Sequence, residues 1–150
     1  MNEKIRAVSS DDLRGLSELF NEYRVFYGKE PDREAASIFL EQRIVNSDSE
    51  IFVAENEMKS LIGFVQLYPL FSSTRMKKLW LLNDLYVAES HRGSGISVLL
   101  IDRAKSLCIE TDACGMILET AKTNGIGNNL YIKTEFSLDA EHNFYSWDNQ

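Results

Sequence analysis

The stretch Arg92–Ser97 has the residue types of an anion-binding turn. Gly93 and Gly95 stand on either side of Ser94, after an apolar strand-like run and before a helical pattern. Glycines let the backbone take positive φ, and the free N–H groups of a helix start point at a bound anion. Arg92 adds a planar cation that matches phosphate oxygens. The alternative is an ordinary strand-to-helix turn in which glycine only relieves crowding.

Three well-known phosphate and nucleophile motifs do not fit these letters. A P-loop needs Lys followed by Ser or Thr after its last glycine, whereas Ile96-Ser97 follows here. The dinucleotide fingerprint needs Gly or Ala at Val98. A hydrolase elbow needs G-x-S-x-G, but Ser94 has glycines directly on both sides. The turn is therefore predicted to hold a phosphate of another kind.

Asp84 is the other residue with a chemical interpretation, because it interrupts the apolar run "LWLLNDLYV". An unpaired buried charge is costly, so this carboxylate should have a partner or a task. Strand alternation predicts that Leu82, Asp84 and Tyr86 share one face. Asp84 could act as a base or hold an ammonium group; the plainer interpretation is that it accepts hydrogen bonds from a neighbouring loop.

The surrounding pattern predicts one domain, residues 1–150, with seven strands and four helices in the order β-α-α-β-β-β-α-β-α-β-β. The strands are expected over 3–9, 50–56, 60–71, 77–88, 115–121, 135–139 and 143–149, and the helices, with their capping residues, over 9–28, 31–46, 96–110 and 124–134. This order is typical of an α/β (α+β) fold, a mixed sheet with helices on its faces.

Capping residues predict where the helices begin, and apolar residues at helical spacing predict which face of each helix is buried. Ser10 or Asp11 is the predicted N-cap of the first helix, and Pro31 is predicted to open the second. The expected apolar stripes are Leu13, Leu16, Leu19, Phe20 and Tyr23 in the first helix, Ile38, Phe39, Gln42 and Val45 in the second, and Leu99, Leu100, Ala104, Leu107 and Cys108 in the third.

Composition narrows the class of protein. A net charge of -7 argues against nucleic-acid binding, which favours a basic face. No apolar run reaches the roughly 20 residues of a membrane span, and the charged N-terminal residues do not resemble a secretory signal, so a cytoplasmic protein without membrane partners is expected. Cys108 and Cys114 lack metal-ligand spacing, so reduced thiols and no metal site are expected.

Two segments together resemble the GNAT superfamily of N-acetyltransferases. Arg92–Ser97 is similar to its coenzyme-A motif Q/R-x-x-G-x-G/A after a strand. "ETAKTNGIGNNLYIKTEF" is similar to its T-x-x-x-N-x-x-A-x-x-L-Y-x-x-x-G-F element, with Thr120, Asn124, Leu130, Tyr131 and Phe136 at matching positions. "LNDLYV" and "ETAKTN" look most like the polyamine- and histone-type branch.

The resemblance implies a mixed, mostly antiparallel sheet of about six or seven strands with about four helices, and acetyl-CoA as cosubstrate. The pantetheine arm would lie along the strand ending Leu85-Tyr86-Val87, between strands that splay apart. The residues implied in coenzyme binding are Leu85, Tyr86, Val87, Arg92, Gly93, Ser94, Gly95, Ile96, Ser97 and Asn124. Asn124 has the equally simple interpretation of a helix N-cap.

The implied reaction is direct attack of a primary amine on the thioester, without a protein nucleophile. Tyr131 stands where the family has its general acid, and a phenol can donate at neutral pH. Asp84 is the first candidate base, with a proton-relaying water as an alternative. Glu119, on the neighbouring strand, is the second candidate base and a candidate substrate-binding residue, or else a solvated strand end. Tyr23, Phe26 and Tyr27 could form a wall of the amine site or belong to the core.

Three residues depart from the family motifs, namely Ser97, Gly127 and Glu135, where Gly or Ala, Ala, and Gly are usual. Glu135 implies a different turn after its helix, one that could shift Tyr131, because glycine there permits positive φ. These departures leave open an alternative function, a catalytically weak acyl-CoA-binding sensor or interaction protein. By resemblance, the terminal strands 135–139 and 143–149 would also support a homodimer.

Overall fold

The computed structural model describes residues 2–150 and divides the chain into two compact units, Met1–Glu119 and Thr120–Gln150. The first unit holds a five-stranded sheet in the order β1-β2-β3-β4-β5. Its strands are β1 (Lys4–Ala7), β2 (Glu50–Glu55), β3 (Leu61–Ser72), β4 (Lys77–Val87) and β5 (Met116–Ile117). The first four pair antiparallel and β5 pairs parallel to β4, so the predicted mixed, mostly antiparallel sheet is confirmed.

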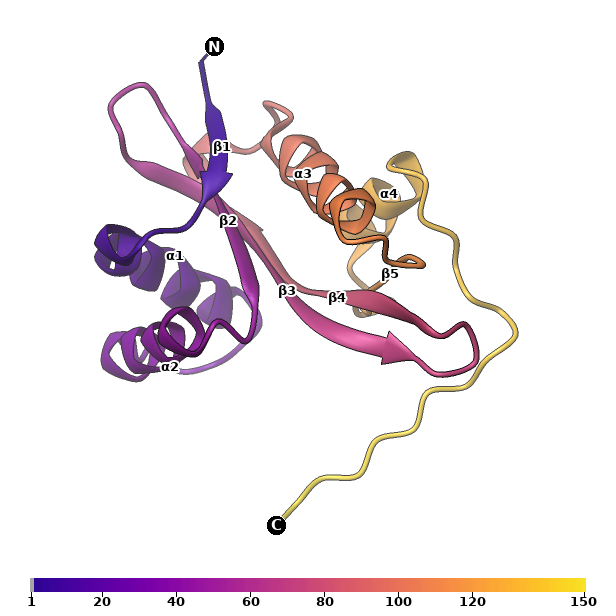
Figure 1. Cartoon of the computed structure of the whole chain (residues 1–150). Coiled ribbons are helices and arrows are strands. Elements are labelled where there is room, and N and C mark those ends of the chain that lie inside the picture. The colour runs from indigo at the N-terminus through magenta and orange to yellow at the C-terminus, as the bar shows by residue number, and fades with distance from the viewer. Residues whose placement is uncertain (1) are drawn as a thin grey trace. The chain divides into compact units, whose positions relative to one another are not determined.

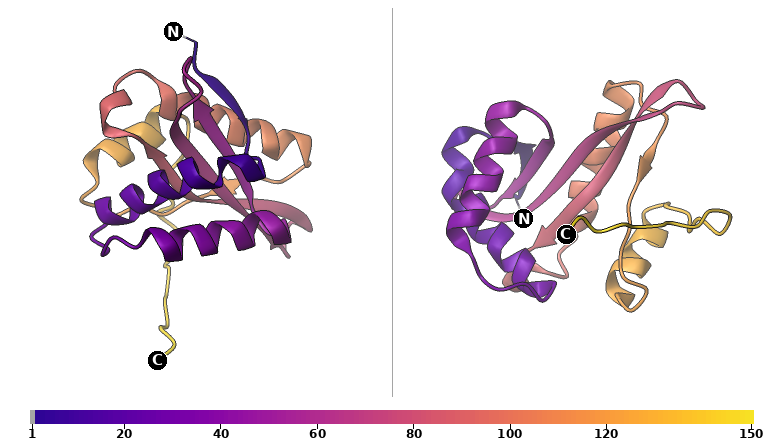
Figure 2. Two further views of the ribbon diagram at one scale, coloured as in Figure 1. Left: turned by 90° about the vertical axis from the view of Figure 1, so that its left-hand side faces the viewer. Right: turned by 90° about the horizontal axis from the view of Figure 1, so that it is seen from below.

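Helices cover both faces of this sheet. α1 (Leu13–Phe26) and α2 (Arg33–Asn46) lie together on one face, and α3 (Ile96–Glu110) lies on the other (Figures 1 and 2). α3 has the predicted bounds. The stripe predicted for α1 is also found: Leu16, Leu19 and Phe20 are buried in a core with Phe64 of β3.

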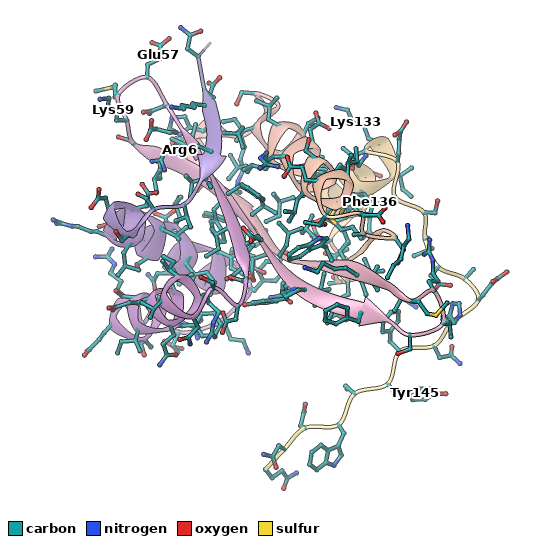
Figure 3. All side chains as sticks on the ribbon, in the orientation of Figure 1. Arg6, Glu57, Lys59, Lys133, Phe136 and Tyr145 are labelled. Carbon is teal, nitrogen blue, oxygen red and sulfur yellow. The ribbon has the colours of Figure 1, made fainter. Side chains whose placement is uncertain are left out.

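The start of α1 differs by a few residues from the prediction. A 3-10 turn, η1 (Ser10–Asp12), precedes the helix, and Asp12 accepts a hydrogen bond from the N–H of Ser9 at 2.8 Å. Arg6 of β1 donates to both Asp12 and Glu55, each at 2.7 Å, so a single cation joins β1, η1 and β2 (Figure 3). This pairing holds the pKa of Asp12 below its usual value, chiefly through the hydrogen bond from Arg6.

The prediction for α2 was wrong in two respects. The helix begins at Arg33 because Asp32, one residue after Pro31, is the cap and accepts the N–H of Ala35 at 3.0 Å. The buried stripe is Ala36 and Leu40, with Ile44 packed beside them, whereas Ile38, Phe39 and Val45 are exposed. The phase of the helix turns Ala36, Leu40 and Ile44 toward the core with α1.

The α3 stripe is largely as predicted, with one exception. Leu100, Ala104 and Leu107 are buried, but Leu99 is 42% exposed, and Ile96 and Ile101 supply the remaining buried positions. Gly63 of β3 lies directly below this helix: a side chain there would come within 3.5 Å of both Leu100 and Ile96. The odd-numbered residues of this part of β3 therefore face α3, and the even-numbered ones face α1 and α2.

Strand number is lower than the six or seven expected. The predicted strands 135–139 and 143–149 are absent from the second unit, whose one regular element is α4 (Gly125–Lys133). Glu135 and Phe136 belong to the cap of α4, and residues 143–149 are exposed without strand pairing among residues 2–150. A strand forms only against a partner edge, which the apolar pattern of a segment cannot reveal by itself.

β5 is also shorter than the predicted strand 115–121. Its pairing with β4 consists of Trp80 with Met116 and Leu81 with Ile117. Glu119 lies two residues beyond the end of this strand and is exposed, so its predicted place on a strand was wrong. The exposed position agrees with the plainer interpretation of Glu119 as a solvated residue.

Candidate active site

The turn before α3 has the backbone of an anion site. Gly93 and Gly95 have φ of 80° and 85°, a region that favours glycine, while a methyl group on either would meet nothing within 4 Å. Backbone conformation, not space, therefore requires these glycines. The first amide of the helix region with a backbone acceptor is that of Leu99, bonded to Gly95 at 3.2 Å. Within residues 2–150, the N–H groups from Gly93 to Val98 have no such acceptor.

Neighbouring side chains hold this turn in place. Ser94 donates its hydroxyl to the carbonyl of His91 at 2.7 Å, which closes the loop upon itself. Ile96, 2% exposed, anchors the helix start in the core. Ser97 lies in the first helical turn and is half-buried. Six successive unpaired amides at a fixed helix start form a positive backbone surface that suits phosphate oxygens.

Arg92 lies toward β4 and α1. Its Nε donates to the carbonyl of Val87 at 2.9 Å, and its guanidinium lies 5.3 Å from the ring centres of both Phe26 and Tyr86. Such cation–π contacts orient an arginine without removing its charge. The predicted cation is therefore present beside the turn, and its side chain also links the turn to an aromatic cluster.

β4 presents an open edge next to this turn. Its pairing with β5 ends at Leu81, although the strand continues to Val87. Ala88 donates to Ile62 of β3 at 2.8 Å, and because main-chain groups alternate along a strand, those of Val87 and Leu85 point away from β3. The carbonyl of Val87 already accepts Arg92 on that side. Leu85 and Val87 thus offer main-chain groups to an extended ligand.

A β-bulge in β4 changes the face on which Asp84 lies relative to Leu82. Gln66 pairs with Asp84 but the next residue, Leu67, pairs with Leu82, so Asn83 is the extra residue. Leu82 therefore shares the α3 face with Leu67, and the prediction that Leu82 and Asp84 share a face was wrong. A bulge adds one residue on one strand and reverses the alternation beyond it. Asp84 and Tyr86 do share the face of α1 and α2.

Asp84 is a buried carboxylate, 5% exposed. It accepts the side-chain amide of Gln66 at 2.8 Å and that of Asn83 at 3.2 Å. No Lys or Arg of residues 2–150 forms an ion pair with it. Burial and the negative charge of Asp84 together raise the pKa of Tyr68 to about 12. The partner of Asp84 is an amide on the adjacent strand, not the neighbouring loop of the plainer prediction.

The predicted aromatic residues come together at the end of α1. Tyr23 lies 5.0 Å from Tyr27 and 6.0 Å from Tyr86 between ring centres, and Phe26 lies 5.2 Å from Tyr27. Tyr23 is half-buried, whereas Phe26 and Tyr27 are 57% and 48% exposed, so the cluster is a surface wall that joins the core at one end. Burial raises the pKa of Tyr86, which keeps its phenol protonated. The hydroxyl of Tyr23 donates to the carbonyl of Asn83 at the bulge, at 3.3 Å.

A hollow of about 390 Å³ on the first unit has an acidic lining. It is lined by η1, α1, the β2–β3 turn and the end of β4, and its charged lining residues are Asp11, Asp12, Glu18, Glu22 and Lys59. Four carboxylates against one lysine give this part of the surface a negative potential that attracts cations.

In the second unit, Asn124 is the N-cap of α4. Its Oδ1 accepts the N–H of Gly127 at 3.1 Å, and its Nδ2 donates to Thr120 at 3.0 Å. A methyl group on Gly127 would lie 2.9 Å from Cγ of Asn124, so glycine in place of the family's usual alanine leaves room for this cap. The capping interpretation of Asn124 is therefore confirmed.

Glu135 does not change the turn after α4, contrary to the prediction. It has φ of 72°, the left-handed conformation that glycine would adopt. The amides of Phe136 and Glu135 donate to the carbonyls of Tyr131 and Ile132 at 2.9 and 3.1 Å, which is a complete Schellman cap. The ring of Phe136 lies 5.7 Å from that of Tyr131 in an edge-on contact. The hydrogen bonds of the cap outweigh the strain of a side chain at this position.

Other classes of site find little support in residues 2–150. No group of three His, Cys, Asp or Glu side chains is placed to bind a metal ion. None of the helices has the length and apolar character needed to cross a membrane. Cys108 and Cys114 are free thiols, and burial raises the pKa of Cys108, which disfavours its nucleophilic thiolate form.

Comparison with models of protein families matches this chain to a known group of enzymes. The model described as "Acetyltransferase (GNAT) family" matches residues 14–145. The chain belongs to the GNAT family of acetyltransferases. The predicted resemblance is confirmed, and the protein is an acetyl-CoA-dependent N-acetyltransferase. GNAT enzymes use acetyl-CoA to acetylate small-molecule or peptide amines.

Individual relatives agree with this family. The chain is 37% identical over 135 residues, 90% of each chain, to "Uncharacterized N-acetyltransferase YhfO" of Bacillus subtilis strain 168. It is 34% identical over 111 residues, 74% of this chain and 76% of the other, to a probable acetyltransferase of Haemophilus influenzae. A crystal structure of a probable acetyltransferase superposes with a TM-score of 0.93 at 35% identity, covering 98% of both chains.

Sequence reasoning missed two features of this GNAT site. Gln66, the buried partner of Asp84, reads in sequence as one polar residue within the strand run "GFVQLYP". The bulge at Asn83 leaves no sequence mark beyond the polar pair Asn83-Asp84 inside an apolar strand. The pair Asn83-Asp84 could have suggested both the bulge and a buried hydrogen-bond donor, because a buried carboxylate requires donors.

Proposed function

We propose that this protein transfers the acetyl group of acetyl-CoA to a primary amine by direct attack on the thioester. The observation that carries the proposal is the run of unpaired amides from Gly93 to Val98 beside the open edge of β4. Phosphate oxygens would accept hydrogen bonds from the unpaired amides, and the amide groups of a pantetheine arm would pair with the open edge of β4. The residues present therefore fit acetyl-CoA without rearrangement of the turn.

The coenzyme-binding set is the one that the family motif implies. The Arg92–Ser97 turn would hold the pyrophosphate through its backbone N–H groups, with Arg92 as the cation. Leu85 and Val87 would pair with the pantetheine arm, and Tyr86 between them faces the acceptor side. Asn124 is a cap whose amide already has two partners, so its contribution would be to fix the start of α4.

The acceptor would enter on the face of α1 and α2. Tyr23, Phe26 and Tyr27 supply an aromatic wall, which suits an alkylammonium group. The acidic hollow lined by Glu18 and Glu22 would raise the local concentration of such a cation. Glu119 would contribute a further carboxylate near the acceptor. The polyamine- and histone-type branch remains a prediction.

Bound acetyl-CoA supplies a thioester whose carbonyl carbon can be attacked by a neutral nitrogen. Asp84 would accept the proton of the ammonium, through a water molecule because its carboxyl group is almost buried. The new C–N bond would form as the C–S bond breaks, and the acetylated nitrogen would release its surplus proton to solvent, from which Tyr131 regains the proton that it gives to the sulfur. Tyr131 would donate its phenolic proton to the departing sulfur. A protein nucleophile is not needed in this scheme.

Both units would act as a single domain, since the family match runs through both. A homodimer is also proposed, because Phe144, Tyr145 and Trp147 in the C-terminal segment are at least 77% exposed. Large exposed aromatic groups are typical of interaction surfaces. The expected location is the cytoplasm, with neither nucleic acid nor membrane as partner.

Thiol release with acetyl-CoA tests the proposal against three amines: spermidine, a 2-deoxystreptamine aminoglycoside and a peptide with one internal lysine. Turnover of at least one is expected. Asp84→Asn should lower kcat and remove the acidic limb of the pH–rate profile. Tyr131→Phe should lower kcat with the acetyl-CoA affinity unchanged. Asp102→Asn, at an exposed position on α3, is the matched control for Asp84→Asn.

Tight acetyl-CoA binding without turnover of any amine would contradict the enzymatic proposal and favour the sensor alternative. That alternative has lost part of its support, because Glu135 takes the backbone conformation of glycine. Full activity of Asp84→Asn and of Tyr131→Phe would contradict the assignment of base and acid while leaving acetyl transfer intact.

A further inference from the structure

Gln66 is a wholly buried polar side chain in the middle of β3, 0% exposed. Its Nε2 donates to Oδ2 of Asp84 at 2.8 Å, and its Oε1 accepts the hydroxyl of Ser49 at 2.9 Å. Ser49 lies just before β2, so side chains link the start of β2, β3 and β4. A buried amide without partners would be costly, and both ends of this one are bonded.

The carboxylate of Asp84 determines which way the amide of Gln66 faces, and the hydroxyl of Ser49, which can donate or accept, holds the other end of that amide. A flipped amide would place Oε1 against the carboxylate of Asp84, where two acceptors would meet, and would direct Nε2 toward the hydroxyl. In the observed orientation each donor faces an acceptor. Oδ2 of Asp84 is therefore held on the side of Gln66, and Oδ1 is left with the longer contact, 3.2 Å, from the exposed residue Asn83 at the bulge.

The charged groups around Asp84 are few. Tyr68 lies two residues beyond Gln66 on the same face, and burial and the charge of Asp84 raise its pKa. Arg43 lowers the pKa of Tyr68, and Asp48 raises it. Arg43 itself is paired with Asp48 at 2.7 Å. Across the sheet face, the hydroxyl of Tyr23 donates to the carbonyl of Asn83, next to Asp84 in the chain, at 3.3 Å.

A neutral donor has a different effect on a carboxylate than a cation has. A paired arginine or lysine would bind both oxygens strongly and would make the group a poor proton acceptor. An amide stabilises the charged form more weakly, and here it occupies one oxygen and leaves the other with only the 3.2 Å contact from Asn83. The environment of Asp84 therefore suits a group that must be charged and must also take up a proton.

We propose that Gln66, held by Ser49, is a positioning residue for acetyl transfer: it stabilises the charged form of Asp84 and directs Oδ1 toward the incoming amine. The inference rests on the proposed role of Asp84 as base. It adds two residues that lie outside the family motifs, one on β3 and one before β2.

The first measurement follows the side-chain carboxyl carbon of Asp84 by ¹³C NMR as a function of pH in the whole protein. Loss of a hydrogen bond to the charged form favours protonation, so the titration midpoint in Gln66→Leu should move up by about one pH unit. Ser49→Ala should move it in the same direction by less, because the amide remains but can rotate. Gln42→Leu, the same change at an exposed site on α2, should leave it in place.

The second measurement is the pH dependence of kcat for the amine of the three-amine panel that is turned over fastest. If Gln66 acts through Asp84, the acidic limb in Gln66→Leu should move by the same amount as the NMR midpoint. kcat should fall several-fold, while the affinity for acetyl-CoA stays unchanged. A purely structural Gln66 would lower stability without moving the limb.

The outcomes separate this inference from the proposed function. If the limb and the midpoint stay in place in folded Gln66→Leu, the positioning role is overturned and Asp84 can still be the base. If Asp84→Asn keeps its activity and its acidic limb, the base assignment fails and this inference fails with it. Should Gln66→Leu not fold, the smaller shift in Ser49→Ala decides: its presence supports the inference, and an unmoved midpoint and limb overturn it.

Discussion

Glu135→Gly is the substitution for which the structure predicts a gain of stability. Glu135 has φ of 72°, and its amide and that of Phe136 complete the Schellman cap of α4. In this conformation the Cβ of a non-glycine residue crowds the following carbonyl. Replacement by glycine removes that crowding and leaves both hydrogen bonds of the cap in place.

The size of the gain follows from two opposing terms. A left-handed conformation costs a residue with a Cβ about 1–2 kcal/mol. The greater freedom of glycine in the unfolded chain offsets about 0.5–1 kcal/mol of this. The net expectation is a gain of about 1 kcal/mol, which corresponds to an opening equilibrium about fivefold less favourable.

Hydrogen exchange at the amide of Phe136 measures this opening directly, because that amide donates to Tyr131 within the cap. Glu135→Ala is the matched variant: it removes the carboxylate but keeps the Cβ, so the difference between the glycine and alanine variants reports the backbone effect alone. Exchange is expected to be about fivefold slower with glycine than with alanine. Equal or faster exchange with glycine would refute the conclusion that Glu135 is strained.

Two further stability predictions use other local contacts. Asp12→Asn should lower the free energy of unfolding by about 1.5–3 kcal/mol at neutral pH, since the pair with Arg6 depresses the pKa of Asp12. A depressed carboxyl pKa contributes stability above the unfolded value of 3.8 and loses it as pH falls, so urea unfolding should show the two proteins converging in acid; a constant difference would contradict this. In α4, Gly125→Ala should stabilise by about 0.5–1 kcal/mol, since a methyl group there meets nothing within 4 Å, whereas Gly127→Ala should not, since it would displace the cap Asn124. Equal thermal shifts of the two variants would argue against that contact.

Sequence reasoning succeeded where the information is local. The bounds of α3, the glycine turn before it and the buried face of α1 follow from residue spacing, capping chemistry and the conformational range of glycine. The GNAT motifs were recognised for the same reason, because the coenzyme turn is a continuous segment. Asp84 was identified as a carboxylate inside an apolar run, because burial of an unpaired charge is costly.

Predictions failed where a residue's conformation depends on neighbours distant in the chain. The phase of α2 was decided by its cap and by the core beneath it, and the predicted C-terminal strands would have required pairing with a strand edge, which these segments do not make within residues 2–150. The left-handed Glu135 shows that hydrogen bonds of a cap can override the preference of one residue.

The sequence alone determined that this protein has a strand, a glycine turn and a helix start able to hold a phosphate, because that arrangement is set by contiguous residues. Only the tertiary structure decided what Asp84 does with its charge. Its donor, Gln66, comes from another strand, and the bulge at Asn83 sets the face on which it lies. Strand register and side-chain partners across a sheet arise from packing of the whole unit, which no single segment of the chain encodes.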